Sequence, residues 1–221
     1  MEALAAANEN ARVSARILAN TPSRRAASCL ASALLGGALI VATAATAQQA
    51  PRAETSAQGN SAIAYGDGWA TVVPVPAGWD SDCCQRAPER NVNLLVYPHG
   101  WDGKGDDRVM TLTVWTNGRP TLDADWQADA SDYQAHFPDA VAQPFSVAVR
   151  ERRCRSAVYT AKDGMRDYVA FCDAGSGLNF RFGWSMTLYG EHADRAPLEA
   201  AFRSVVAHTL PMSATIERRA E

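Results

Sequence analysis

The sequence lacks the short motifs that mark common enzyme active sites. Its 221 residues hold no Cys-x-x-Cys redox pair, no phosphate-binding loop, no dinucleotide fingerprint and no clustered histidines. The string nearest to a serine-hydrolase elbow, Gly183–Thr187, lacks the second glycine and lies in a strand-like run. Asp102, Asp106 and Asp107 do not match the calcium-loop spacing and are interpreted as a solvated turn. We therefore expect no metal, no cofactor and no catalytic residue.

The N-terminal region predicts a cleavable export signal. Arg24-Arg25 precedes an uncharged stretch with an apolar middle, Leu34–Val41, and small residues at Ala45–Ala47, the three parts of a secretory signal. A membrane anchor needs about 20 predominantly apolar residues, and this apolar core is shorter. We expect removal of residues 1–47 after Sec or twin-arginine export. The mature protein is then periplasmic or secreted, with no stable membrane insertion.

The mature chain is mildly acidic and has the size of one domain. The signal holds four of the 21 basic and two of the 24 acidic residues, so the net charge from residue 48 onward is −5. Nucleic-acid binding favours a clustered basic face, so we expect no nucleic-acid partner. Residues 48–61 are polar and predict a disordered linker, and residues 213–221 predict a tail. Residues 62–212 then form a single domain with one core.

Two of the four cysteines outside the signal predict a cross-strand disulfide. Lys162–Gly164 has the composition of a three-residue hairpin loop, flanked by Ala161 and Met165 as a pair. In that register Cys154 faces Cys172 at a non-hydrogen-bonded position, where Cα atoms lie about 4.5 Å apart. This separation suits a disulfide.

The other two cysteines, Cys83 and Cys84, are adjacent in the chain. Adjacent cysteines rarely bridge each other, because the ring strains the peptide between them. Two free thiols, a link to a partner chain and a vicinal bridge all stay open for this pair.

The hydrophobic pattern predicts strands, a helix, more strands and a closing helix. Leu122, Trp126, Ala130, Tyr133 and Phe137 recur three or four residues apart, which is typical of an amphipathic helix. The closing helix is expected over residues 198–209, and strands over 66–75, 91–97, 109–115, 145–150, 154–161, 165–173 and 178–188. Both helices need the sheet to bury their apolar stripes. We predict an α+β fold: an antiparallel sheet of six or seven strands with two main helices packed on it.

This order of elements resembles the Mog1/PsbP-like fold, together with the segment VPVPAGW at Val73–Trp79 and its Pro76–Trp79 turn. The resemblance covers residues 62–212. Members of this fold are mostly binding or assembly factors, many of them small exported bacterial proteins, so the resemblance implies a non-enzymatic role by analogy. It assigns no functional residue.

The loops at residues 79–90 and 98–108 are the best candidate for a functional face, because both are long and polar. They carry Trp79, His99 and Trp101, which we take as candidate binding residues. A loop tryptophan can equally cover the core, and that alternative stays open.

Two functions remain. The first is an exported, non-enzymatic binding or assembly factor for an unknown envelope protein or small ligand, which predicts an exposed apolar or aromatic patch. The second is an envelope enzyme with a site assembled from scattered residues, including His99 and Cys83 or Cys84. The enzyme requires a thiol and His99 within hydrogen-bonding reach.

Mass mapping of peptides from the unreduced protein should show Cys154 joined to Cys172. A map that joins Cys154 to Cys83 or Cys84 would contradict the predicted register.

Overall fold

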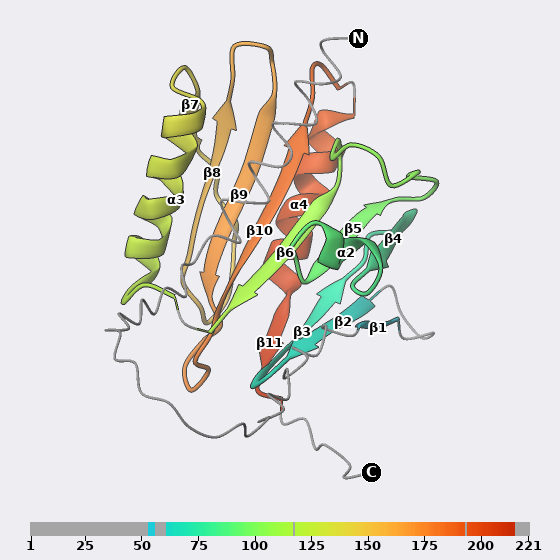
Figure 1. Cartoon of the computed structure of the whole chain (residues 1–221), viewed down its shortest axis with the longest axis vertical. Helices are drawn as coiled ribbons and strands as arrows, with labels where there is room; N and C mark the ends of the chain where they lie inside the picture. Colours follow the sequence, from blue (N-terminus) through green and yellow to red (C-terminus); the bar gives the residue numbers. More distant parts are fainter. Residues whose placement is uncertain (1–52, 56–60, 117, 193, 215–221) are drawn as a thin grey trace, which may run out of the picture.

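The computed structural model describes residues 53–55, 61–116, 118–192 and 194–214. The predicted signal peptide lies outside these residues, as do most of the predicted linker and tail. Figure 1 shows a large twisted sheet beside a small one, with α3 along one side of the large sheet and α4 behind it. Within the described residues, no helix is long and apolar enough to cross a membrane.

The large sheet has seven strands, and every neighbouring pair in it is antiparallel. Its spatial order is β4-β5-β6-β10-β9-β8-β7. The strands are β4 (Trp79–Asp82), β5 (Leu94–Pro98), β6 (Met110–Trp115), β7 (Val141–Pro144), β8 (Cys154–Thr160), β9 (Arg166–Asp173) and β10 (Arg181–Leu188). The predicted α+β class and the antiparallel sheet of six or seven strands are therefore confirmed.

A second, small sheet has the order β1-β2-β3-β11. Its strands are β1 (Ala53–Thr55), β2 (Ser61–Gly66), β3 (Trp69–Pro74) and β11 (Leu210–Met212), and the helices are α2 (Arg86–Glu89), α3 (Leu122–His136) and α4 (Arg195–His208). Three residues of the predicted linker thus form β1. The expected strand over 66–75 is instead the second half of a hairpin, since Asp67-Gly68 turns the chain and Gly68 has φ 78°.

One face of the large sheet is apolar and holds the main core. Phe182, Trp184, Met186 and Leu188 of β10 alternate onto this face, and all are almost fully buried. Helix α4 covers it with an apolar stripe of Leu198, Phe202, Val205 and Val206. The indole of Trp184 donates to the hydroxyl of Thr209 at 3.1 Å, just beyond the end of α4. This face therefore anchors α4 by both packing and a buried hydrogen bond.

The opposite face of the sheet is polar along β6 and β10 and apolar on either side, where Leu95 of β5 and Tyr159, Val169 and Phe171 of β8 and β9 lie. On β6 and β10 it presents Thr111, Thr113, Ser185 and Thr187, and the Thr111 and Ser185 hydroxyls are 2.6 Å apart. Helix α3 covers this face over β8 and β9, while α2 and residues 98–108 cover it over β5. Residues that alternate along one strand thus face two different environments.

Helix α3 is turned differently from the prediction. It begins after Thr121, whose hydroxyl accepts from the Ala124 amide at 3.1 Å, a common N-terminal cap. Its fully buried residues are Leu122, Asp125, Asp129 and Tyr133, whereas Trp126, Ala130 and Phe137 of the predicted stripe are only half-buried. The ion pair of Asp125 with Arg181 of β10 favours this rotation.

The β8–β9 hairpin has the predicted register. Thr160 lies opposite Arg166, and Cys154 lies opposite Cys172, where the Cα atoms are 4.1 Å apart and a disulfide joins the sulfurs. Cys83 and Cys84 form a vicinal disulfide. Of the three states left open for that pair, the structure has the vicinal bridge.

Replacing Cys154 and Cys172 together by alanine should lower the free energy of unfolding by about 3 kcal/mol, because the cross-link spans 18 residues and restricts the unfolded chain. Urea denaturation of the oxidised proteins measures the change. The matched control replaces Cys83 and Cys84, whose bridge closes almost no chain, and should lose under about 1 kcal/mol. Equal losses in the two variants would contradict this account.

Candidate functional site

Trp101 closes a small hydrophobic cluster rather than facing solvent. Its ring lies 4.7 Å from that of Tyr97, and the guanidinium carbons of Arg86 and Arg90 lie 5.2 and 5.0 Å from its centre. The indole donates to the carbonyl of Lys104 at 3.0 Å. Cation–π and aromatic contacts of this kind stabilise a loop, so Trp101 acts as a cover on the cluster beneath α2.

Trp79 and His99 lie at one end of the β4–β5 pair. Trp79 is half-buried against the main core. The side chain of His99 is 62% exposed, and its Nδ1 lies 2.8 Å from the carboxylate of Asp80. Neither residue lines the cleft described below.

The enzyme hypothesis required a thiol beside His99, and the structure has no such arrangement. Cys83 and Cys84 are bonded to each other. The His99 amide donates to Gly78, whereas Cys83 follows Asp82 at the other end of β4. Five residues of extended chain separate these positions by roughly 16 Å. The cysteine–histidine pair that the alternative enzyme function requires is therefore not formed by these residues.

A cleft of about 450 Å³ lies at the end of the sheet where β6 and β9 finish and β8 and β10 begin. Three separate segments build its walls: the end of β6 with the turn before α3, the segment before β8, and the β9–β10 loop with the strand ends that flank it. Its charged residues are Arg119, Arg152, Arg153, Arg181, Glu151 and Asp173. The cleft thus holds four guanidinium groups and two carboxylates, although the chain from residue 48 onward is acidic overall.

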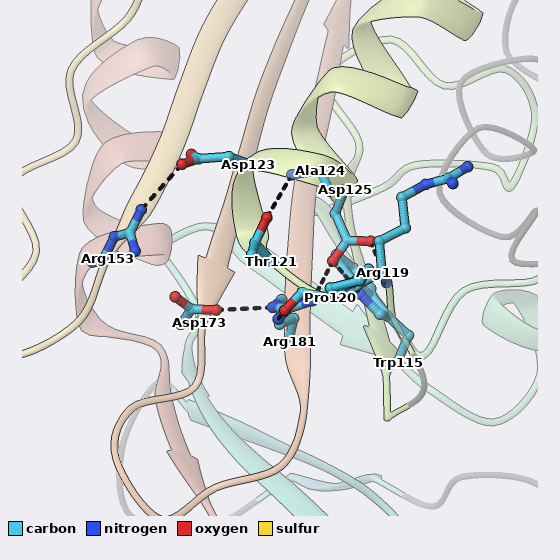
Figure 2. Close-up of polar contacts among 10 residues, drawn as sticks. All are labelled: Trp115, Arg119, Pro120, Thr121, Asp123, Ala124, Asp125, Arg153, Asp173 and Arg181. Atoms are coloured by element: carbon cyan, nitrogen blue, oxygen red, sulfur yellow. Dashed lines mark hydrogen bonds and ion pairs between the residues drawn. The ribbon is translucent and has the colours of Figure 1, made fainter.

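Arg181 is the hub of the cleft, as Figure 2 shows. Its Nη1 lies 2.6 Å from Asp125, and its Nε lies 2.9 Å from Asp173. It also donates to the carbonyls of Arg119 and Pro120 at 2.7 and 3.3 Å. Burial acts to lower the pKa of Arg181, but its hydrogen bonds with the two carboxylates outweigh this effect and raise it.

Asp125 completes this network from the first turn of α3. It is 8% exposed, and its carboxylate accepts from the Arg119 amide at 2.9 Å and from the Trp115 indole at 3.3 Å. One carboxylate thereby ties the helix, the preceding turn and two strands together. Such a buried pair is stable only when its remaining hydrogen bonds are made, as they are here.

The other arginines of the cleft differ in how much they can offer a ligand. Arg152 donates to the carbonyls of Val206, Ala207 and Thr209, and burial lowers its pKa. It therefore caps the end of α4, where a positive charge complements the helix dipole.

Arg119 and Arg153 are the accessible cations. The Arg153 side chain is 67% exposed and makes a single long contact, 3.4 Å, with Asp123. A hydrogen bond from Arg155 holds the pKa of that aspartate below its usual value. Arg119 is exposed and forms no ion pair with another described residue, and Figure 2 shows its side chain extending away from Arg181.

The cleft offers arginine side chains to a ligand, but its lining residues include no cysteine and no histidine. Guanidinium groups favour carboxylate and phosphate groups as partners. Among the described residues, no three His, Cys, Asp or Glu side chains are grouped as metal ligands. Exposed large apolar side chains are limited, in the described part, to Val141, Leu210 and Met212. The sequence predicted an exposed apolar or aromatic patch for a binding protein. None of these three side chains is aromatic, so the polar cleft is the better candidate for a binding site.

The site is not evident from the sequence. Its residues come from three separate segments, and Arg181 pairs with Asp125, 56 positions earlier. The available signal was the Arg119-Pro120-Thr121 turn, in which an arginine and a helix cap come between a strand and a helix.

Comparison with known proteins gives likenesses of fold only. No family model and no curated protein matches the chain. Among solved structures, it is similar to LpqN, involved in cell envelope biogenesis of Mycobacterium tuberculosis, with a TM-score of 0.44 and 14% identity over 66% of this chain and 84% of that one. It is also similar to PsbP (CyanoP) from Synechocystis sp. PCC 6803, with a TM-score of 0.39 and 11% identity over 79% of this chain and 97% of that one. The second of these is a PsbP protein, and neither likeness assigns a function to any residue of this chain.

Replacing Arg181 by methionine should lower the free energy of unfolding by about 3 kcal/mol, because it leaves the buried carboxylate of Asp125 without its cation. Arg181→Lys keeps the charge but cannot reach both carboxylates, so its loss should be smaller. Urea denaturation compares the variants. A methionine variant within about 0.5 kcal/mol of the wild type, the usual range of surface substitutions, would show that the hub is not structural.

Proposed function

We propose that this protein is a periplasmic or secreted binding or assembly factor with no chemistry of its own, and that it recognises an acidic group of its partner at the arginine-lined cleft. The partner is an envelope protein or a small ligand. The observation that carries this proposal is the cleft itself, whose lining holds four arginines, two of them, Arg119 and Arg153, accessible.

The disulfides support a location outside the cytoplasm. All four cysteines that follow residue 47 are paired in two bridges. Disulfides form and persist in oxidising compartments and are rare in the cytosol. The export signal predicted for residues 1–47 agrees with this location.

The rigidity of the cleft supports recognition rather than catalysis. Arg181 uses its donors on protein groups and so fixes the walls, while Arg119 and Arg153 keep exposed donors. Pre-formed donors reduce the entropy lost when a ligand binds. Residues 98–108, by contrast, use the ring of Trp101 to cover their own cluster.

A capture experiment tests this proposal. The oxidised mature protein is immobilised and exposed to an envelope extract without reductant, in wild-type form and as Arg119→Glu/Arg153→Glu. Charge reversal at both accessible cations should reduce the captured partner at least about tenfold, since like charges across an interface are repulsive.

The matched control is Lys104→Glu/Arg108→Glu, which makes the same charge change on the loop of His99 and Trp101. This control should capture as much partner as the wild type, and thermal unfolding should show both variants folded. Loss of capture by the loop variant alone would contradict the cleft and favour the loops as the docking face.

A further inference from the structure

Helix α3 places two carboxyl groups against the sheet, and only one of them meets a cation. Asp125 forms an ion pair with Arg181. Asp129, one turn later on the same buried face, is 6% exposed, and its Oδ2 is buried without a hydrogen-bond partner among the described residues. A buried carboxylate in this position carries a large desolvation cost.

A second carboxyl group faces Asp129 from the sheet. Asp167 of β9 is 1% exposed, and the Tyr133 hydroxyl donates to its Oδ2 at 2.7 Å. The Thr187 hydroxyl donates to the other oxygen. Tyr133 lies one turn after Asp129 on α3, so the helix brings its own acid close to this one. Both oxygens of Asp167 accept hydrogen bonds, an arrangement that suits a carboxylate.

Every titratable group facing Asp129 from the packed elements is acidic or neutral. Asp132 and Tyr133 lie on α3, Tyr159 on β8 and Asp167 on β9. The nearby cations of β8 and β10, Arg155 and Arg181, are held by the side chains of Asp123, Asp125 and Asp173. Burial first, and then the charges of Asp132 and Asp167, raise the pKa of Asp129 to about 8. Burial also raises the pKa of both tyrosines, which therefore remain hydroxyl groups.

We propose that α3 is a proton-controlled latch: Asp129 is a carboxylic acid while α3 is docked on the sheet, and loss of its proton to solvent releases the helix. A charge on Asp129 is costly, because its Oδ2 is buried without a partner and Asp167 is a second buried carboxyl group on the strand beneath α3. One proton on Asp129 removes that cost.

The packing of the two main helices shows why α3 is the element released. Two of its four fully buried residues are acids, Asp125 and Asp129. Its apolar contacts come from Leu122 and Tyr133 together with the half-buried Trp126 and Phe137, in a cluster smaller than the main core. Helix α4, in contrast, buries four apolar side chains in the main core. Asp125 also holds a wall of the cleft, so release of α3 would open the cleft. This consequence rests on the proposed function, whereas the latch itself does not.

The direction of the pH effect follows from the two protonation states. In the released helix Asp129 has an ordinary aspartate pKa, near 3.9, whereas in the docked helix it is raised. The docked state therefore binds one more proton between these values. The contribution of Asp129 to docking is complete below about pH 4, weakens about tenfold per pH unit at most, and is lost as the pH rises through about 8.

Amide hydrogen exchange of the oxidised mature protein between pH 5 and 8, corrected for intrinsic exchange rates, tests the latch. The opening constant of the α3 amides should rise at least about a hundredfold over this range, while that of α4 amides should change much less. In Asp129→Asn, which is neutral at every pH, the rise should fall to under about threefold. An unchanged rise in this variant would overturn the proposal.

Asp132→Asn is the matched control, since it removes an exposed carboxyl group from the same helix. It should keep the pH-dependent opening, with a midpoint shifted slightly. Carbon-13 NMR titration of the aspartate carboxyl groups in the wild type gives a second readout that needs no variant. One aspartate titrating near pH 8 is expected, and titration of every aspartate below pH 5 would overturn the latch.

Discussion

The two faces of the large sheet differ, and the rest of the molecule is arranged around that difference. Along β10, apolar side chains alternate with Arg181, Ser185 and Thr187. One face takes α4 and the main core. The opposite face is polar along β6 and β10 but carries Tyr159, Val169 and Phe171 on β8 and β9, so α3 packs there with both aromatic and acidic side chains. Of its two buried acids, Asp125 meets the cation of Arg181 and holds the cleft, whereas Asp129 forms no ion pair with a described residue.

The cleft and the loops over β5 illustrate two uses of arginine. Over β5, the guanidinium groups of Arg86 and Arg90 lie over the ring of Trp101, so these cations and the ring bind each other by cation–π contacts. At the cleft, Arg181 holds two carboxylates and leaves the neighbouring cations exposed. Side chains that already bind one another have few free donors for a partner. At the cleft, the donors of Arg119 and Arg153 stay exposed beside walls that Arg181 holds. Long polar loops are therefore a weaker guide to a site here than the ends of the strands.

The sequence predicted the features that depend on local chemistry. A glycine-containing loop set the register that places Cys154 opposite Cys172, and the change of period located α3 with Thr121 as its cap. The rotation of α3 could not be predicted from periodicity, because the stripe with Trp126 and the stripe with Asp125 both repeat every three or four residues. Which stripe is buried depends on its partners on the sheet. Those partners lie on strands that follow much later in the chain, as Arg181 does. The cleft was missed for the same reason: its walls meet only when three distant segments reach one end of the sheet.

The central claim is that partner recognition occurs at the end of the sheet that Arg181 organises. The most direct measurement is an amide-exchange footprint of the oxidised protein with and without its captured partner. The account predicts protection in residues 118–121, 151–153 and 174–181, which form the walls of the cleft. Protection confined to residues 98–108, around His99 and Trp101, would contradict it.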